Sequence, residues 1–213
     1  MPPSEDSPRR LIVEGADDQF SVINLVARHG IDTKSNDATY VDDSDNMNEL
    51  LRRIPEEIKG GAYQRLGFVV DGNADPAKRW REVRKAANAA EFELPEEMPR
   101  DGFIGPGDRA GTLIGVWLMP DNGSPGALEE FLTTLVPESD PCWPYAKEVV
   151  VAAKKKGARY KDKEIRKANI HTWLAWQSPP GFPYGKAIAA EYFGQKSELA
   201  KRFVAWYKRL FFE

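Results

Sequence analysis

Short apolar runs alternate along the chain with longer segments in which apolar residues recur every three or four positions. Four of the runs have the length of strands and are bounded by Gly, Asp or Pro: 10–15, 38–43, 65–72 and 112–121. Such continuous runs are typical of strands buried on both faces of a parallel sheet. The spacing between them predicts helices over 17–29, 46–59 and 75–90. This alternation predicts an α/β fold with a mostly parallel, four-stranded sheet.

The pattern becomes helical in the second half of the chain. From Tyr145 onward nearly every segment has helical spacing, and the last one, 197–212, places Leu199, Phe203, Trp206 and Leu210 on one face. The Pro-rich stretch 136–145 separates the two patterns. We therefore predict three parts: a disordered lead-in over 1–8, an α/β core over 9–135, and a helical C-terminal region over 136–213 packed on or beside that core.

Composition limits the classes of protein that fit. Of the 213 residues, 41% are hydrophobic and 30% charged, and the net charge of −3 argues against a chain that coats nucleic acid by bulk electrostatics. The single cysteine, Cys142, excludes an internal disulfide and fits a reducing compartment. No apolar run approaches the ~20 residues of a membrane helix, and the N-terminus has no apolar signal core. We expect a cytoplasmic protein without a membrane anchor.

Acidic residues follow three of the four predicted strands: Glu14, Asp17 and Asp18 after the first, Asp71 and Asp75 after the third, and Asp121 after the fourth. Ligands bind at the carboxyl ends of strands in parallel sheets, so we expect these side chains to share one edge. Clustered carboxylates are typical ligands of hard divalent cations. The pattern predicts a site for one or two Mg²⁺ or Mn²⁺ ions, with phosphate oxygens completing the coordination.

Structural roles compete with metal binding at several of these positions. Asp75 precedes Pro76, so a helix N-cap is its first expected role. Asp17 and Asp18 also suit the positive end of a helix dipole. Glu14 differs, because glutamate is a poor N-cap and here follows Leu-Ile-Val directly. A functional role is therefore expected for Glu14 above all.

Two segments, LIVEGADDQF (11–20) and LGFVVDGNAD (66–75), together resemble the toprim domain. This Rossmann-like domain is shared by topoisomerases, bacterial primases, recombination-mediator proteins and the overcoming-lysogenization-defect (OLD-type) nucleases. An Asp four residues after the Glu is more similar to the OLD-type branch. GVWLMPDNGSPGALEEFL (115–132) resembles a small, mainly prokaryotic family of uncharacterised toprim-related proteins. The resemblance covers about residues 9–135 and implies a metal-dependent nuclease.

The resemblance also implies roles for individual residues. Glu14 would be a metal ligand or general acid/base, Asp18 the second acid of that motif, and Asp71 the first acid of an Asp-x-Asp pair. The chain departs from the pattern at Asn73, where the second acid of the pair would stand. The missing oxygen could come from Asp75 or from the acidic segment after the fourth strand, which contains Asp121, Glu129 and Glu130.

Basic residues are expected to contact the substrate. OLD-type nucleases use a basic residue near the metals, for which Lys163, Lys167 and Lys186 are candidates, and Lys167 is assigned the catalytic role. The runs 154–168 and 201–212 place Lys and Arg among aromatics, a pattern that can hold a nucleic-acid backbone and stacked bases, although a solvated helix face has the same pattern. The expected nucleic-acid contacts are Lys154, Lys155, Lys156, Lys163, Lys186 and Arg109, the last in a loop or hairpin that feeds the fourth strand.

Three functions are consistent with the sequence. The first is a Mg²⁺- or Mn²⁺-dependent nuclease acting on DNA or RNA. The resemblance implies that it works in anti-phage defence or repair beside a separate ATPase of the ABC or AAA class, since the chain has no Walker motif of its own. The second is a degenerate toprim module that binds nucleic acid or a protein without cleavage, which Asn73 favours. The third is a small-molecule phosphotransfer enzyme. Neither of the two histidines, His29 and His171, forms part of a nucleophilic triad pattern, and both are expected to be structural.

Overall fold

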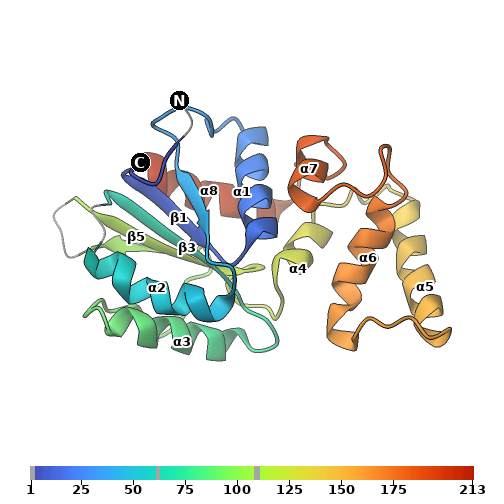
Figure 1. The fold of residues 1–213 in the computed structure, drawn as a ribbon, viewed down its shortest axis with the longest axis horizontal. Coiled ribbons are helices and arrows are strands. Elements are labelled where there is room, and N and C mark those ends of the chain that lie inside the picture. The colour runs from blue at the N-terminus through green and yellow to red at the C-terminus, as the bar shows by residue number, and fades with distance from the viewer. Residues whose placement is uncertain (1–2, 61–62, 108–110) are drawn as a thin grey trace.

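The fold was analysed in a computed structural model that describes residues 3–60, 63–107 and 111–213. A five-stranded sheet with the order β2-β1-β3-β5-β4 forms its centre (Figure 1). The four predicted strands are present and parallel: β1 (Arg9–Val13), β2 (Tyr40–Asp43), β3 (Arg65–Asp71) and β5 (Leu113–Met119). The structure confirms an α/β fold with a mostly parallel sheet and a helical C-terminal part.

The predicted number of strands was wrong, because β4 (Phe103–Pro106) adds a fifth strand, antiparallel to β5. This short strand ends in Pro106, which lacks the N–H that a central strand needs but is tolerated at an edge. It has neither the length nor the alternation by which strands are found in a sequence. Its antiparallel pairing with β5 agrees with the expectation that this segment feeds the fourth predicted strand as a loop or hairpin.

Helices cover both faces of the sheet. Successive residues of a strand point to opposite faces. Ile12 therefore packs with α2 (Met47–Gly60) and α3 (Pro76–Asn88), whereas its neighbours Leu11 and Val13 pack with α1 (Ala16–Arg28) and α8 (Glu198–Phe212). The two hydrophobic clusters explain why the strand sequences are apolar without alternation.

Two glycines allow α8 to lie close against the sheet. Gly67 of β3 and Gly115 of β5 are register partners. A Cβ atom on Gly115 would lie 2.6 Å from a Leu210 methyl group, and one on Gly67 would lie 3.0 Å from the same methyl group. The apolar face of α8 that its spacing predicts is buried here, with Phe203, Trp206 and Leu210 fully covered. The C-terminal helix thus completes one layer of the α/β core.

The other C-terminal helices lie beside the sheet (Figure 1). α5 (Cys142–Lys155) and α6 (Ile165–Leu174) form an antiparallel hairpin joined through the short 3₁₀ helix Asp162–Glu164, and α7 (Tyr184–Ala189) packs on α1. α4 (Leu128–Thr133) follows β5 and contacts α6. None of the helices in the described part of the chain is long and apolar enough to cross a membrane.

The lead-in contacts the sheet before β1 begins. Ser7 is buried and its hydroxyl donates to the Ala38 carbonyl at 3.3 Å. The Pro8 carbonyl accepts hydrogen bonds from the backbone N–H groups of Gln64 and Arg65 at 2.8 and 3.0 Å. The last residues of the segment that was predicted to be disordered therefore extend the β1–β3 pairing.

Candidate active site at the carboxyl edge of the sheet

Four carboxyl groups meet at the carboxyl edge of the sheet. Glu14 follows β1 directly, Asp71 is the last residue of β3, Asp18 lies in the first turn of α1, and Glu129 lies in the first turn of α4. β1 and β3 are neighbours, so Glu14 and Asp71 leave the sheet side by side. The pKa values of Glu14, Asp18 and Asp71 all respond to charges of this same group. The sequence prediction of an acidic edge thus corresponds to a real cluster, here called the acidic edge.

Burial and mutual repulsion raise the pKa values of the acidic edge. Burial, followed by the charges of Glu14, Glu129 and Asp17, raises the pKa of Asp18 to about 7. The pKa of Asp71 lies well above its ordinary value, because the side chain is buried and faces Asp18, Glu14 and Glu129. Each of these carboxylates loses solvation and gains negative neighbours, and both effects oppose ionisation.

Two oxygen atoms of the cluster lack a partner. Glu14 Oε2 and Asp71 Oδ1 are buried, and no N–H or hydroxyl group of the described residues donates to them; the only hydrogen bond open to the two carboxyl groups is the one they share when one of them is protonated. A buried polar atom without a partner is costly, and native proteins rarely leave one unless a ligand, ion or water satisfies it. These two atoms, from neighbouring strands, are the part of the acidic edge that is most clearly incomplete.

The chain provides only part of the positive charge that this cluster needs. Burial raises the pKa of Glu14, and a hydrogen bond with the Asp71 carboxyl group and the positive charge of Arg79 act against the rise. Arg79 is committed elsewhere as well, because its Nε donates to the Asp71 carbonyl at 3.1 Å and its Nη1 pairs with Glu82 at 2.6 Å. At the outer rim Lys167 Nζ lies 3.7 Å from Glu129 Oε1 and 4.0 Å from Asp17 Oδ2.

Helix N-termini add partial positive charge. The backbone N–H of Met47, the first residue of α2, helps to lower the pKa of Glu14, and the backbone N–H of Asp18 acts on its own carboxylate. Both N–H groups lie in first turns, where they have no intrahelical partner. These contributions do not reverse the upward pKa shifts of Glu14 and Asp18, so an unmatched negative charge remains.

Asp75 and Asp121, two other predicted metal ligands, are occupied by local hydrogen bonds. Asp75 is the N-cap of α3 and accepts from the Lys78 backbone N–H at 2.8 Å. Asp121 closes a turn by accepting from the backbone N–H groups of Gly123 and Ser124 at 3.1 and 2.6 Å, and from the Ser124 hydroxyl. Although burial opposes them, these hydrogen bonds lower the pKa of Asp121. The structure does not bring either side chain into the cluster.

Glu129, rather than Glu130, faces the acidic edge. Glu130 Oε2 accepts from the Ala127 backbone N–H at 2.9 Å, and its other oxygen pairs with Arg166 at 3.4 Å. This is the reciprocal contact of a helix capping box. Glu129 is left free to contact Lys167 and to repel Asp71. The choice between the two glutamates, which the sequence left open, is settled by the cap.

Asn73, where the chain departs from the toprim pattern, has a structural role. Its φ of 52° lies in the left-handed region, which Asn tolerates better than most residues. Its backbone N–H donates to the Gly126 carbonyl at 2.6 Å, and its carbonyl accepts from the Gly126 N–H at 2.7 Å. This bridge fixes the loop after β3 to the loop before α4. Asn73 therefore helps to bring Asp71 and Glu129 together through its backbone.

Comparison with known proteins yields one family. A family model described as "Protein of unknown function (DUF3226)" matches residues 8–212. The chain belongs to the DUF3226 family. No curated protein and no solved structure matches it. The description of DUF3226 names no activity, so the function of the acidic edge has to be argued from its geometry.

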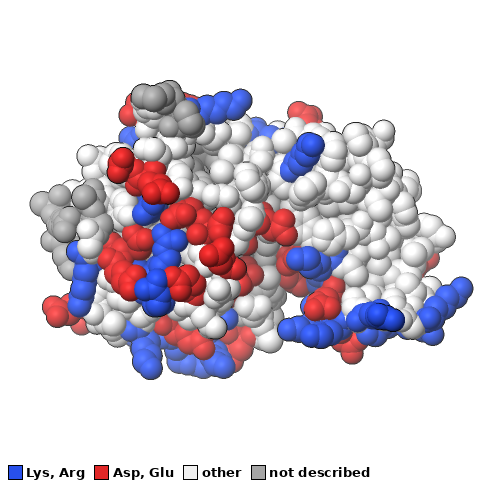
Figure 2. All heavy atoms as spheres, viewed as in Figure 1, with Lys and Arg blue, Asp and Glu red and all other residues white. Residues whose placement is uncertain are grey.

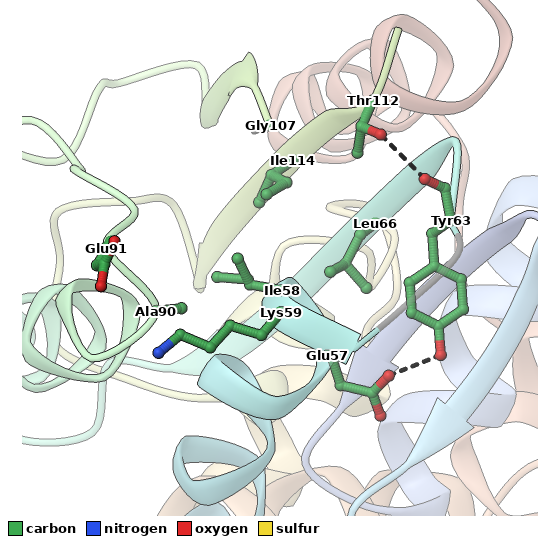
Figure 3. Close-up of a pocket in the computed structure, with 10 residues that line it drawn as sticks. All are labelled: Glu57, Ile58, Lys59, Tyr63, Leu66, Ala90, Glu91, Gly107, Thr112 and Ile114. Carbon is green, nitrogen blue, oxygen red and sulfur yellow. Dashed lines mark hydrogen bonds between the residues drawn. The ribbon is translucent and has the colours of Figure 1, made fainter. Parts of the chain in front are cut away.

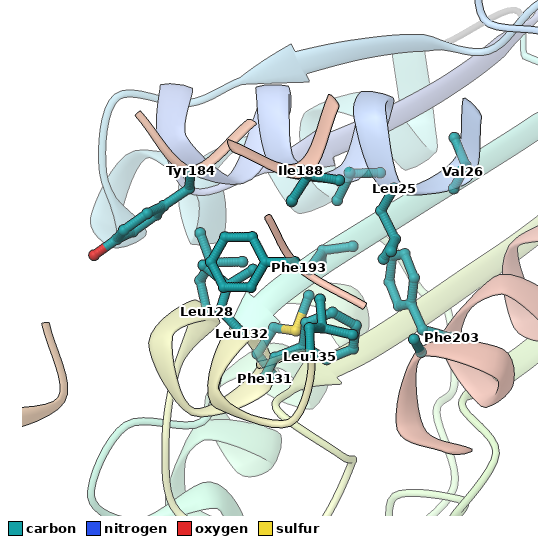
Figure 4. Packing of buried hydrophobic residues seen from close by; sticks show 14 of the residues in the cluster. Leu25, Val26, Leu128, Phe131, Leu132, Leu135, Tyr184, Ile188, Phe193 and Phe203 are labelled. Carbon is teal, nitrogen blue, oxygen red and sulfur yellow. The ribbon is translucent and has the colours of Figure 1, made fainter. Parts of the chain in front are cut away.

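Two further side chains lie near this edge: Tyr184, which the sequence analysis did not single out, and His171, which was expected to be structural. Tyr184 of α7 is 1% exposed, and its hydroxyl lies 3.2 Å from Nε2 of His171, whose ring stacks on the tyrosine ring at 5.1 Å. Figure 4 shows the Tyr184 hydroxyl pointing away from the hydrophobic cluster. Burial and the nearby charges of Glu129 and Asp17 raise the pKa of Tyr184. No motif marks Tyr184, because the tertiary packing of α7 on α1 brings it here.

Of the predicted basic residues that the structure describes, Lys167 alone pairs with a carboxylate of the acidic edge. Lys154, Lys155, Lys156 and Lys163 are exposed on the α5–α6 hairpin. Lys186 is exposed on α7, with its ammonium group 4.7 Å from the centre of the Phe182 ring. Arg109 lies outside the described residues. The lysines therefore divide into one at the rim of the candidate site and a group on the neighbouring hairpin.

The side chains do not already form a closed metal site. Within the described ranges, no group of three or more His, Cys, Asp or Glu side chains is arranged so that it could hold a metal ion. The unpartnered oxygens of Glu14 and Asp71 nevertheless fit a hard cation, because carboxylate oxygens are its preferred ligands. The acidic edge thus has the ligand chemistry for a divalent ion without a preformed coordination sphere.

The best-defined cavity lies at the other end of the sheet. It has a volume of about 250 Å³ and is lined by residues that include Glu57, Lys59, Tyr63 and Thr112 (Figure 3). Leu66 and Ile114, near the first residues of β3 and β5, form its floor. Its lining contains none of the predicted acidic site residues. Ligands of open parallel sheets bind at the carboxyl ends of the strands, so we do not assign the reaction to this cavity.

Proposed function

We propose that this DUF3226 chain is a Mg²⁺- or Mn²⁺-dependent phosphodiesterase that acts on nucleic acid, with the acidic edge as its active site. The observation that carries the proposal is the pair of buried oxygens on Glu14 and Asp71 that receive no N–H or hydroxyl donor from the described residues, within a cluster whose pKa values are raised by burial and by neighbouring carboxylates. A divalent cation would satisfy both oxygens and offset the repulsion.

Each residue of the edge has a part in the proposed reaction. Glu14, Asp18, Asp71 and Glu129 would hold one or two ions. A bound divalent ion supplies Lewis-acid activation of water and stabilises the leaving oxygen of a phosphodiester. Lys167 lies on the exposed side of Glu129, where its ammonium group can receive a phosphate oxygen of the substrate. Arg79 lowers the pKa of Glu14 and so favours the ionised form that binds metal.

The toprim resemblance supports the same reaction. Its glutamate and first aspartate correspond to Glu14 and Asp71, the two residues with unpartnered oxygens. The structure adds Glu129 as a carboxylate near Asp71, where Asn73 lacks an acid. By the same resemblance, we propose that the protein works in the cytoplasm of prokaryotic cells, in defence or repair, beside a separate ABC- or AAA-type ATPase.

A second candidate function is a toprim module that binds nucleic acid or a protein partner without cleavage. Two observations favour it. Asn73 uses the expected acidic position for a backbone bridge. The carboxylates in the described part of the chain also do not converge as a preformed ligand set. The two candidates differ in whether metal binding is coupled to hydrolysis.

A cleavage assay separates them. The wild-type protein is incubated with single- and double-stranded DNA and RNA in Mg²⁺, then in Mn²⁺, beside Glu14→Gln and Asp71→Asn. Substitution of residues that merely orient metal ligands costs about 10- to 100-fold, so loss of a ligand should reduce cleavage by more than about 100-fold. Asp75→Asn is the matched control, since Asn also caps helices and should leave cleavage intact. Absence of cleavage with either ion would favour the binding module.

A further inference from the structure

Charge is segregated between the two halves of the molecule. The segment 142–174, which contains α5 and α6, has nine Lys and Arg but only three Asp and Glu. It therefore carries a formal charge of +6 in a chain whose total is −3, and the remaining residues together carry −9. All nine basic side chains are exposed. Figure 2 shows Lys and Arg gathered along the lower edge of this half.

Most of these basic residues form no ion pair with the residues that the structure describes. Lys154 pairs with Asp162 at 3.5 Å, and Arg166 and Lys167 pair with Glu130 and Glu129. Six others make no ion pair with the residues that the structure describes: Lys147, Lys155, Lys156, Arg159, Lys161 and Lys163. Cations favour the C-terminal end of a helix, but that effect acts only within the last turn. Glu148 and Glu164 of the segment also make no ion pair with the described residues, so the excess of positive charge without an ion pair is four, which favours a polyanionic partner.

An exposed aromatic stack lies at the opposite end of the hairpin. Tyr145, in the first turn of α5, is 58% exposed, and Trp176, just after α6, is 41% exposed. Their rings stack at 5.5 Å with an interplanar angle of 27°. Large aromatics exposed to water as a pair are uncommon in a monomer surface and point to a ligand with a flat apolar face.

An open, nearly flat patch of α5 lies between these two features along the helix. It is lined by Lys147, Val151 and Lys155, four residues apart, with Glu148 and Ala152 beside them. α5 has 14 residues, so the helix that carries these side chains is about 21 Å long. The stack, the patch and the lysine-rich turn between α5 and α6 thus lie along one helix.

We propose that the α5–α6 hairpin binds a single-stranded segment of nucleic acid, with an unpaired base on the Tyr145–Trp176 stack and its phosphates along the lysines. A positive groove combined with aromatic platforms is the usual recognition mode for single strands. A duplex cannot offer a base to the stack, because its bases are already stacked and paired. This inference deepens the proposed function by naming the form of nucleic acid that would reach the acidic edge. It rests on the proposed function only for the claim that the acidic edge acts on nucleic acid.

The hairpin also reaches the candidate active site. Arg166 and Lys167 lie near the start of α6 and contact Glu130 and Glu129 of α4. A strand held along the lysine-rich turn would therefore pass from an attractive surface to the acidic edge. Repulsion between its phosphates and the carboxylates would there be relieved by bound divalent ions. Single-strand binding itself needs no metal.

Binding is measured without metal so that its result is independent of cleavage. Glu14→Gln protein in a chelator is titrated with labelled single-stranded DNA, single-stranded RNA and a matched duplex. Tight binding of either single strand, weaker binding of the duplex, and quenching of tryptophan fluorescence are expected. Base stacking on an aromatic is worth roughly 1–3 kcal/mol, so Tyr145→Ala and Trp176→Ala should each weaken single-strand binding by about 5- to 150-fold.

Matched controls isolate the two contributions. Phe212→Ala removes an aromatic of α8 that is 43% exposed, and Lys208→Ala removes an exposed lysine of α8; neither should change affinity. The triple variant Lys155→Ala, Lys156→Ala, Lys163→Ala should reduce the salt dependence of binding by about 2 in log–log slope, at about 0.7 per phosphate contact. Circular dichroism checks that each variant is folded.

The outcomes are distinguishable from those of the nuclease assay. Selective single-strand binding by a protein that does not cleave would support the hairpin's role and overturn only the proposed function. Equal affinity for single strands and duplex, or aromatic variants that bind as tightly as their parent, would overturn the hairpin's role even if the enzyme cleaves.

Discussion

Two groups of carboxylates occupy the same sheet, and their surroundings differ. On β2 and α2, Asp42 and Glu57 contact Arg53 at 2.6 and 2.7 Å and Arg10 at 3.5 and 3.6 Å. The Tyr63 hydroxyl also donates to Glu57 at 2.6 Å. Although burial opposes it, the hydrogen bonds from Tyr63 and Arg53 lower the pKa of Glu57. Two carboxylates here face two guanidinium groups, so the chain neutralises this group itself.

The acidic edge has the opposite balance. Burial and neighbouring carboxylates raise the pKa values of Glu14, Asp18 and Asp71, and two of their oxygens have no partner. The two groups differ in the direction of the pKa shift. The pKa of Glu57 is lowered in the group that the chain neutralises, and the pKa values of Glu14, Asp18 and Asp71 are raised in the group for which we propose a function. Where the chain has supplied the counter-charge, the role is structural. Where it has not, as at the acidic edge, we propose that a cation from solution supplies the counter-charge, since perturbed pKa values cluster at functional sites.

Substitution at the balanced group should have the largest effect on stability. Arg53→Met removes the closest partner of both Asp42 and Glu57 and leaves two largely buried carboxylates to share Arg10. Breaking a buried ion pair from one side costs about 3–5 kcal/mol, and about 2–3 kcal/mol is expected at this partly exposed site. Urea unfolding at pH 7 measures the loss. A change below about 0.5 kcal/mol would mean that the network is an ordinary surface ion pair.

A substitution at the acidic edge should instead increase the free energy of unfolding. The pKa of Asp18 is raised from 3.8 to about 7 in the folded protein. The folded state thus keeps a proton that the unfolded chain releases, and stability is lost as pH rises through that window. Asp18→Asn should therefore raise the unfolding free energy at pH 8, without divalent ions, by about 2 kcal/mol. The gain should disappear near pH 4. Denaturant titrations at both pH values test it, and a less stable variant at pH 8 would contradict the account.

The smallest effect is expected at Asp75. Asp75→Ala removes the N-cap of α3 and should lower the unfolding free energy by about 1 kcal/mol. Asp75→Asn keeps the cap and should change neither stability nor cleavage. Thermal unfolding and the cleavage assay are the two measurements. Loss of cleavage in Asp75→Asn with unchanged stability would place Asp75 among the metal ligands after all.

Local patterns in the sequence predicted most of the fold and, in the candidate site, that Glu14 and Asp71 lie close together. The runs that became β1, β3 and β5 were recognisable because both faces of these strands are covered, and the run that became the edge strand β2 because its residues alternate. The rule that parallel strands share a carboxyl edge then brought Glu14 and Asp71 together. β4 escaped because four residues ending in Pro106 have no strand periodicity.

What remained hidden depends on tertiary packing and on competing local hydrogen bonds. The capping role of Asp75 was foreseen from Asp-Pro, but the turn that occupies Asp121 was not weighed against metal binding. Tyr184 comes to the edge because α7 packs tightly on α1: a Cβ atom on Gly185 would lie 2.7 Å from the Phe20 backbone. A helix of six residues is too short for its hydrophobic periodicity to predict that contact.

The central claim is that the acidic edge binds a divalent cation, and metal-dependent thermal unfolding tests it most directly. Wild-type protein, Glu14→Gln, Asp71→Asn and the control Asp75→Asn are melted at pH 8 with increasing Mg²⁺ or Mn²⁺. At 100 times the dissociation constant, one bound ion adds about 2.7 kcal/mol, or roughly 5–10 °C for a domain of this size. We expect this saturable rise in the wild type and in Asp75→Asn, and its loss in the other two variants. An unchanged midpoint in the wild type, or an equal rise in all four proteins, would contradict the account.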